Sequence, residues 1–198
     1  MNVIKTLKDL IAINSVNPFK TIDVSGKEIG IGNETKIAEY LKEKLVECGF
    51  KVRRQLVQEG IKRLGVPDRY NILGEKGYGE KSLLFTGHMD TVGVKAGWRT
   101  NPFVGTERLF KDKRVIYGLG SNDMKAGLAT ILAASEKINP KNYKLKVAFV
   151  VDEEFWSYGV VKLLESDFLK DVQLAVVPEV GDSSKKSKHQ AIILGGMG

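Results

Sequence analysis

Apolar side chains recur at the three-to-four-residue spacing of an amphipathic helix in four stretches of the chain. In the first stretch Leu7, Leu10 and Ile11 share one face with Val3, and the run stops at the segment Asn14–Pro18. A proline and asparagines are typical helix breakers. The pattern predicts helices at about 3–13, 34–48, 124–138 and 158–166.

The second predicted helix carries boundary signals at both ends. Asn33 is a residue type that caps helix N-termini, and Gly49 is a type that follows C-termini. Cys48 falls on the apolar face with Ile37 and Leu41, so we expect a core residue. It is the single cysteine, which excludes a disulfide within the chain and a cysteine-rich zinc site.

Three short apolar runs predict strands that are buried on both faces, at 83–85, 145–151 and 174–177. Shorter or half-polar strands are predicted at 50–56, 71–73 and 115–117. Buried strands that alternate with helices are typical of an α/β fold. We therefore expect a three-layer domain whose largely parallel central sheet is flanked by helices.

Composition narrows the class of protein. The 198 residues carry a net charge of +7 and are 42% hydrophobic, as in ordinary globular proteins. The basic clusters at 111–114 and 185–188 do not alternate with aromatic residues, which favours a solvated surface over nucleic-acid binding. There is no apolar run long enough for a membrane helix and no signal-peptide pattern, so we expect a cytoplasmic protein.

Acidic residues follow the predicted buried strands. His88 and Asp90 come after the first, Glu153 and Glu154 after the second, and Glu179 after the third. The carboxyl ends of parallel strands meet at one edge of a sheet, where ligands bind. Acids gathered there repel one another unless a cation lies among them. The sequence thus predicts a hydrolytic metal site, with two metals as one form.

The segment Gly118–Asp123, which follows the strand at 115–117, has two other interpretations. It imitates a dinucleotide-binding glycine motif, but Asp123 occupies the third glycine position and would repel a pyrophosphate. Asp123 is also a suitable N-cap for the helix at 124–138, and capping is compatible with metal binding. For His88 the alternative is a surface histidine in a capped loop.

Three linked motifs resemble the family of acetylornithine deacetylase, succinyl-diaminopimelate desuccinylase and glutamate carboxypeptidase, which are cocatalytic zinc peptidases. The motifs are 87–92 (GHMDTV), 118–127 (GLGSNDMKAG) and 152–154 (DEE), and the segments 14–18 and 98–103 are also similar. The resemblance extends from about residue 7 to 179. It implies a metal-dependent hydrolase that cleaves the amide bond of N-acyl amino acids or small peptides.

The resemblance implies a role for each residue. His88 corresponds to the imidazole ligand of one metal, and Asp90 to the residue that orients it. Asp123 corresponds to the carboxylate that bridges both metals, and Glu154 to a ligand of the other. Glu153 corresponds to the general base, which takes a proton from water and returns it to the leaving amine.

Glu179 corresponds to the remaining carboxylate ligand. In the family this residue is usually followed by proline, whereas here Pro178 precedes it. Leu119 stands where the family usually has arginine. The implied cofactor is a pair of Zn²⁺ ions, with Co²⁺ or Mn²⁺ as substitutes.

Family members are longer than this chain. They carry a lid that also forms the dimer, and a later segment that supplies a last histidine ligand. Without these the second metal has only Asp123 and Glu154, and we interpret His189 as a solvated side chain rather than a substitute ligand. We expect residues 1–184 to be the N-terminal part of the catalytic domain, and 185–198 to be a basic tail and the start of a strand toward the lid.

Three hypotheses follow. The chain is the N-terminal part of a metal-dependent amidohydrolase and is impaired alone, or it is one half of a split enzyme. Alternatively, it is a metal-binding or interaction protein without catalysis. An incomplete sheet would also favour self-association or pairing with a C-terminal half.

Overall fold

The centre of the molecule is a six-stranded mixed sheet with the order β10-β9-β5-β8-β4-β3. The computed structural model describes residues 1–179 and 193–195. The three middle strands β9, β5 and β8 are parallel, whereas the pairs β8–β4, β4–β3 and β9–β10 are antiparallel. The strands span Lys51–Gln58 (β3), Arg69–Gly77 (β4), Ser82–His88 (β5), Lys144–Val150 (β8), Val172–Val177 (β9) and Ile193–Gly195 (β10).

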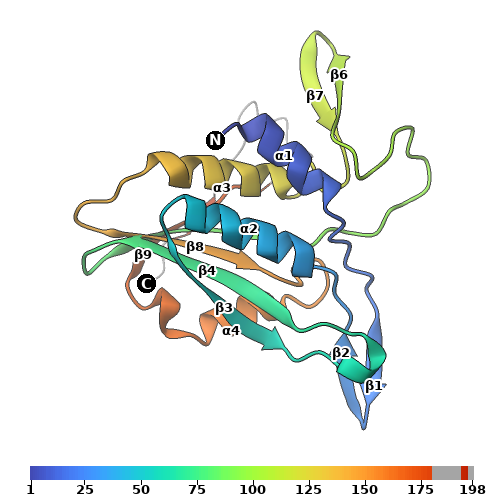
Figure 1. The fold of residues 1–198 in the computed structure, drawn as a ribbon, viewed down its shortest axis with the longest axis horizontal. Helices are drawn as coiled ribbons and strands as arrows, with labels where there is room; N and C mark the ends of the chain where they lie inside the picture. The colour runs from blue at the N-terminus through green and yellow to red at the C-terminus, as the bar shows by residue number, and fades with distance from the viewer. Residues whose placement is uncertain (180–192, 196–198) are drawn as a thin grey trace.

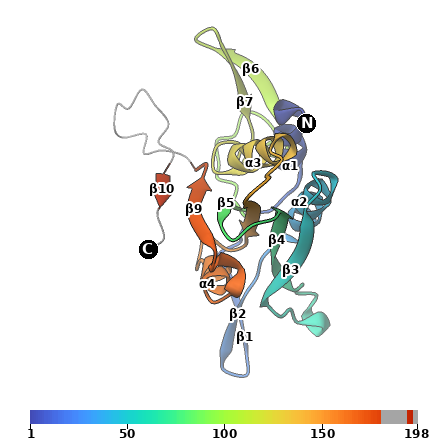
Figure 2. The same cartoon turned by 90° about the vertical axis from the view of Figure 1, so that its left-hand side faces the viewer.

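Helices cover both faces of this sheet (Figures 1 and 2). One face carries α1 (Val3–Ala12), α2 (Thr35–Glu47) and α3 (Lys125–Lys137). The other carries α4 (Tyr158–Leu164) and the short 3₁₀ helix η2 (Asp167–Leu169). The three-layer α/β fold predicted from the hydrophobic pattern is thereby confirmed. The sheet is mixed rather than largely parallel, because only the pairs β9–β5 and β5–β8 are parallel and the three outer pairs are antiparallel.

Strand β8 contributes side chains to two hydrophobic cores, one on each face of the sheet. Val147 and Phe149 pack against the helices α1 to α3, and Ala148 and Val150 pack against α4 and η2. Successive side chains of a strand point to opposite faces. A strand covered on both faces is therefore mostly apolar: six of the seven residues of β8 are buried, and the charged one among them, Lys146, is paired with Asp171.

Two hairpins extend from the body of the molecule (Figure 1). One is β1 (Thr21–Val24) with β2 (Lys27–Gly30), and the other is β6 (Thr106–Phe110) with β7 (Lys113–Tyr117). A short 3₁₀ helix, η1 (Lys62–Leu64), lies between β3 and β4. The strand predicted at 115–117 is thus part of β7, which pairs only with β6 and lies outside the central sheet.

Two predicted boundaries are wrong in detail. The N-cap of α2 is Glu34 rather than Asn33, whose side-chain amide donates to the carbonyl of Asn14 instead. The strand predicted at 71–73 is longer, because β4 continues through Gly74 as it pairs with β8. The other predicted helices and buried strands lie within a few residues of α1, α3, α4, β5, β8 and β9.

The end of the chain is described only in part. The basic cluster at 185–188 and His189 lie outside the described residues, while β10 adds an antiparallel strand beside β9. The domain boundary after residue 184 stays a prediction. Among the described residues, none of the helices has the length and apolar character needed to cross a membrane.

Candidate metal centre

The predicted site residues gather at the carboxyl edge of the parallel strands. His88 is the last residue of β5, Glu153 and Glu154 follow β8, and Glu179 follows β9. Asp123 reaches the same edge from the loop between β7 and α3. Parallel neighbours end on the same side of a sheet, so this topology brings together residues that are far apart in sequence.

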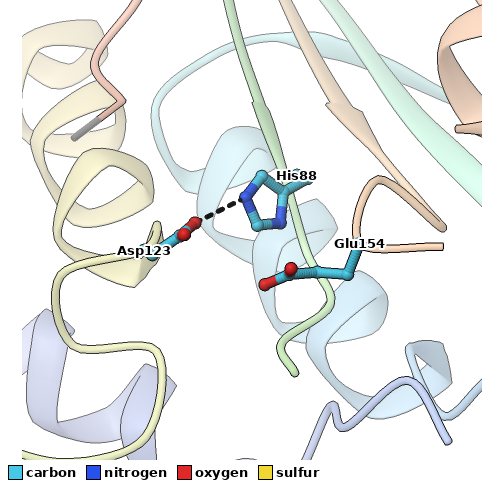
Figure 3. Close-up of side chains that lie close together, drawn as sticks. All are labelled: His88, Asp123 and Glu154. Atoms are coloured by element: carbon cyan, nitrogen blue, oxygen red, sulfur yellow. Dashed lines mark hydrogen bonds and ion pairs between the residues drawn. The ribbon is translucent and has the colours of Figure 1, made fainter. Parts of the chain in front are cut away.

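The imidazole Nε2 of His88 lies at the centre of the group. It is 2.9 Å from Asp123 Oδ1, 3.3 Å from Glu179 Oε2 and 3.8 Å from Glu153 Oε2. One ligand atom each from His88, Asp123 and Glu154 lies within 4.8 Å of the others, close enough to hold a single metal ion. Figure 3 shows Asp123 and Glu154 reaching toward the imidazole from two different loops.

Close packing of α3 on β5 brings Asp123 to His88. A Cβ atom at Gly87 would lie 2.5 Å from Cε of Met124, so a larger residue would have to displace this side chain. Met124 is the N-cap of α3, and the side chain of Asp123 is directed to His88 instead of capping the helix. The alternative role of Asp123 as a helix cap is therefore not used.

The other ring nitrogen of His88 faces Asp90. Nδ1 lies 3.1 Å from the backbone carbonyl oxygen of Asp90 and 3.4 Å from its Oδ1 atom. An oxygen at Nδ1 keeps a proton on that nitrogen, so Nε2 is the nitrogen that can lose its proton and donate a lone pair to a metal ion. The arrangement suits an imidazole that binds a metal through Nε2.

Asp90 also connects the two loops of the site. Its Oδ1 accepts a hydrogen bond from the backbone N–H of Glu153 at 3.1 Å, and its Oδ2 accepts one from Glu154 at 3.2 Å. In return, Oε1 of Glu154 accepts a hydrogen bond from the N–H of Val92 at 3.2 Å. The loop after β5 and the loop after β8 therefore hold each other in place.

A second layer of buried polar residues was not assigned from the sequence. This layer consists of four residues, each at most 3% exposed: Asn17, Arg69, Glu34 and Asp152. The side-chain amide of Asn17 donates to Asp90 and to Asp152, and Arg69 donates to Asp152 and to Glu34. The sequence signals were the resemblances of the segments 14–18 and 152–154 to the family, which gave Asn17 and Asp152 no role.

The charges at this edge shift the pKa values of the site residues. Burial lowers the pKa of His88, but hydrogen bonds to Asp123, Asp90 and Glu179 outweigh it and raise the pKa to about 12. Burial and then the charge of Asp123 raise the pKa of Glu154 to about 7. The carboxylates outnumber the positive charges that face them, as at sites that bind cations.

Known metallohydrolases are similar to this chain in sequence. A protein 36% identical over 90% of this chain is an uncharacterized metallohydrolase of Methanocaldococcus jannaschii, of which the chain covers 44%. A succinyl-diaminopimelate desuccinylase of Nautilia profundicola is also 36% identical, over 97% of this chain and 47% of the relative. The chain thus spans somewhat less than half the length of these two relatives.

Solved structures show the same fold. Human carnosine dipeptidase 1 superposes with a TM-score of 0.65 over 89% of this chain and 38% of its own, at 23% identity. Residues 84–194 match the model of the peptidase family M20/M25/M40, and that segment contains all six predicted site residues. The resemblance inferred from the three motifs is confirmed: the chain belongs to the peptidase family M20/M25/M40.

Proposed function

We propose that this chain forms the metal-binding part of a hydrolase that cleaves amide bonds in N-acyl amino acids or small peptides. One observation carries the proposal: ligand atoms of His88, Asp123 and Glu154 lie within 4.8 Å of one another at the carboxyl edge of the sheet. Membership of a peptidase family supports it.

The donor set fits a divalent transition metal. One imidazole nitrogen with several carboxylate oxygens suits Zn²⁺, and Co²⁺ or Mn²⁺ can take the same donors. His88 and Glu179 would hold one ion, Glu154 would hold a second, and the two oxygens of Asp123 would serve both. Asp90 would keep the proton on Nδ1 of His88.

The chemistry divides between metal and protein. Bound metal ions supply Lewis acidity, which makes water more acidic and polarises a carbonyl group. Glu153 acts as the general base: its carboxylate takes a proton from the attacking water and gives it to the departing amine. Water adds to the carbonyl carbon, the C–N bond breaks, and the products are a carboxylate and an amine.

The position of Glu153 supports this assignment. Its side chain is 48% exposed, and its Oε2 lies 3.8 Å from Nε2 of His88, so a substrate can reach it beside the ligands. Burial raises the pKa of Glu153, and the charges of Asp90 and Asp123 add to this effect against that of His88. A raised pKa makes a carboxylate a better proton acceptor.

The names of relatives suggest the substrate class. Besides the desuccinylase, an acetylornithine deacetylase of Vibrio vulnificus is 38% identical over 65% of this chain and 31% of its own length. Deacetylation and desuccinylation both cleave an amide between an acyl group and an amino acid. We propose an acylated amino acid or a small peptide as substrate.

A Zn²⁺ titration combined with a hydrolysis assay tests the proposal. We expect one tight site on the chain alone, and release of free amine from N-acyl amino acids once a C-terminal half from a full-length relative is added. Two tight sites with turnover by the chain alone would favour a complete enzyme. Zinc binding without turnover under any condition would favour the non-catalytic alternative, and no zinc binding would overturn the proposal.

A further inference from the structure

The turn after β8 needs external support to present its two glutamates. Asp152 has a φ of 65°, in the left-handed region that residues other than glycine seldom adopt. This conformation redirects the chain from the strand toward the site edge, where Glu153 and Glu154 follow. Holding such a backbone requires contacts that outweigh its conformational cost.

The carboxylate of Asp152 is fixed from three sides. Its Oδ1 accepts hydrogen bonds from Nδ2 of Asn17 and from Nη2 of Arg69, both at 3.0 Å. Its Oδ2 accepts a weaker one from the N–H of Tyr158 at 3.4 Å. With 0% of its surface exposed, Asp152 has no access to water, so these donors replace hydration.

Asn17 links Asp152 to the imidazole side of the site. Its Nδ2 donates to Asp90 Oδ2 and to Asp152 Oδ1, each at 3.0 Å, which uses both amide hydrogens. Its own backbone is held in turn, because its N–H donates to the carbonyl of Thr91 at 2.8 Å. An amide side chain is the group that can bridge two carboxylates without adding charge.

Arg69 supplies the positive charge for this layer. Its guanidinium donates to Asp152 and, through Nε at 3.2 Å and Nη2, to Glu34. The pair is packed against the backbone, since a Cβ at Gly32 would lie 2.2 Å from Glu34 Oε2 and 2.3 Å from Arg69 Nε. Any side chain at position 32 would displace the guanidinium.

We propose that Asn17 and Arg69 are positioning residues that hold the turn at 152–154 against His88. Asn17 acts through Asp90, which accepts the N–H groups of both glutamates, and Arg69 acts through Asp152. The inference rests on the proposed function, since it assigns these residues to the support of the metal centre. Neither residue touches the atoms that would bind the metal.

The test uses the nearly isosteric substitution Asn17→Asp in the full chain. It removes both amide donors and places a third carboxylate beside Asp90 and Asp152. We expect Zn²⁺ affinity to fall about 10-fold, the lower end of the cost of losing an outer partner of a metal ligand, because Asn17 contacts Asp90 rather than a ligand. In the metal-free protein, amide hydrogen exchange at Glu153 and Glu154 should speed up, because their acceptor is displaced.

Substitutions of Arg69 give a graded readout. Arg69→Met removes the charge and should weaken Zn²⁺ binding more than Arg69→Lys, which keeps the charge but loses the forked geometry. Lys146→Met is the matched control: Lys146 is also a buried cation paired with an acid, but it lies at the opposite end of β8. It should lower stability and leave zinc affinity unchanged.

The outcomes separate the two proposals. Wild-type protein that binds no zinc contradicts the proposed function, while amide exchange in the metal-free variants still tests the positioning. Zinc affinity and exchange unchanged in Asn17→Asp and Arg69→Met would overturn the positioning role alone. If Asn17→Asp does not fold, Asn17→Ser removes the amide without adding charge, and the same loss of affinity is expected.

Discussion

The two ends of the parallel strands both hold buried charge, but they balance it differently. At the amino end Lys144 and Lys146 pair with Asp171, and Lys146 also lies 3.6 Å from Glu75. At the carboxyl end the imidazole of His88 faces the acids Asp90, Asp123, Glu153 and Glu179.

The difference separates a structural cluster from a candidate binding site. Opposite charges that satisfy one another leave no unpaired charge for a ligand, and removing one partner leaves the other charge uncompensated. Acids that exceed the nearby positive charge favour uptake of a cation. Burial alone therefore does not identify the functional end, whereas the charge balance around each buried group does.

The largest expected effect comes from Glu153→Ala. Loss of the general base should lower amide hydrolysis by about 10²- to 10⁴-fold, while bound Zn²⁺ is retained. Steady-state kinetics and metal analysis of the chain combined with the added C-terminal half check this. Glu165→Ala is the matched control, since Glu165 is the C-cap glutamate of α4 and pairs with Lys162. Full hydrolysis by Glu153→Ala with its metal in place would contradict the proposed role.

A substitution at the amino end of the strands, where the charges are paired, should instead lower the stability of the fold. Lys146→Met leaves Asp171 with one cation fewer and also removes a 2.6 Å hydrogen bond to the carbonyl of Phe168. Breaking a buried pair costs about 3–5 kcal/mol, so we expect the free energy of unfolding to fall by about 3 kcal/mol. Denaturant titration measures it, and a change below about 0.5 kcal/mol, as at ordinary surface sites, would contradict the comparison.

His88→Ala, at the carboxyl end of the strands, should instead lower the affinity for metal. Removing the imidazole deletes a predicted ligand, so Zn²⁺ affinity should fall by at least about 100-fold, the upper end of what an outer partner costs. Calorimetric titration measures it. His189→Ala is the control because it changes the other histidine of the chain, and we expect no change. A matching loss there would assign His189 to the second metal.

The smallest expected effect is the pH dependence of stability that comes from Asp171, at the amino end of the strands. Burial acts to raise the pKa of Asp171, but hydrogen bonds from Lys144 and Lys146 outweigh it and lower the pKa from 3.8 to about 2. A lowered pKa in the folded state adds stability above the unfolded value, and this stability is lost as the pH falls through the folded value.

The stability difference between wild type and Asp171→Asn should therefore be constant above about pH 4 and shrink between about pH 4 and pH 2. Denaturant titrations at several pH values measure the difference. A difference that grows as the solution is acidified would mean that the lysines do not stabilise the ionised carboxylate.

The candidate site could be predicted from the sequence because most of its residues follow recognisable strands. His88, Glu154 and Glu179 each come directly after an apolar run, and the topology of parallel strands places such residues at one edge. No detail of packing was needed. The metal-binding roles themselves remain predictions.

The second layer of buried polar residues could not be predicted from the sequence in the same way. Asn17 contacts Asp152 across 135 positions of sequence, and Arg69 contacts it across 83. No local pattern signals such pairs, because they depend on how β4 and the segment before β1 pack in three dimensions. The hairpin β6–β7 was also missed in part, since β6 is mostly exposed and lacks the alternation that marks a half-buried strand.

Strand order has a consequence for how this protein is made. β4 and β5 are consecutive in the chain, but β8 lies between them in the sheet. On the ribosome their facing edges lack a partner until Val150 has been synthesised, about 3–12 s after His88 at about 5–20 residues per second. Open strand edges pair readily with other chains. Glu153 and Glu154, which follow β8, therefore reach the site edge late in translation, and the facing edges of β4 and β5 have to be protected from aggregation until β8 is made.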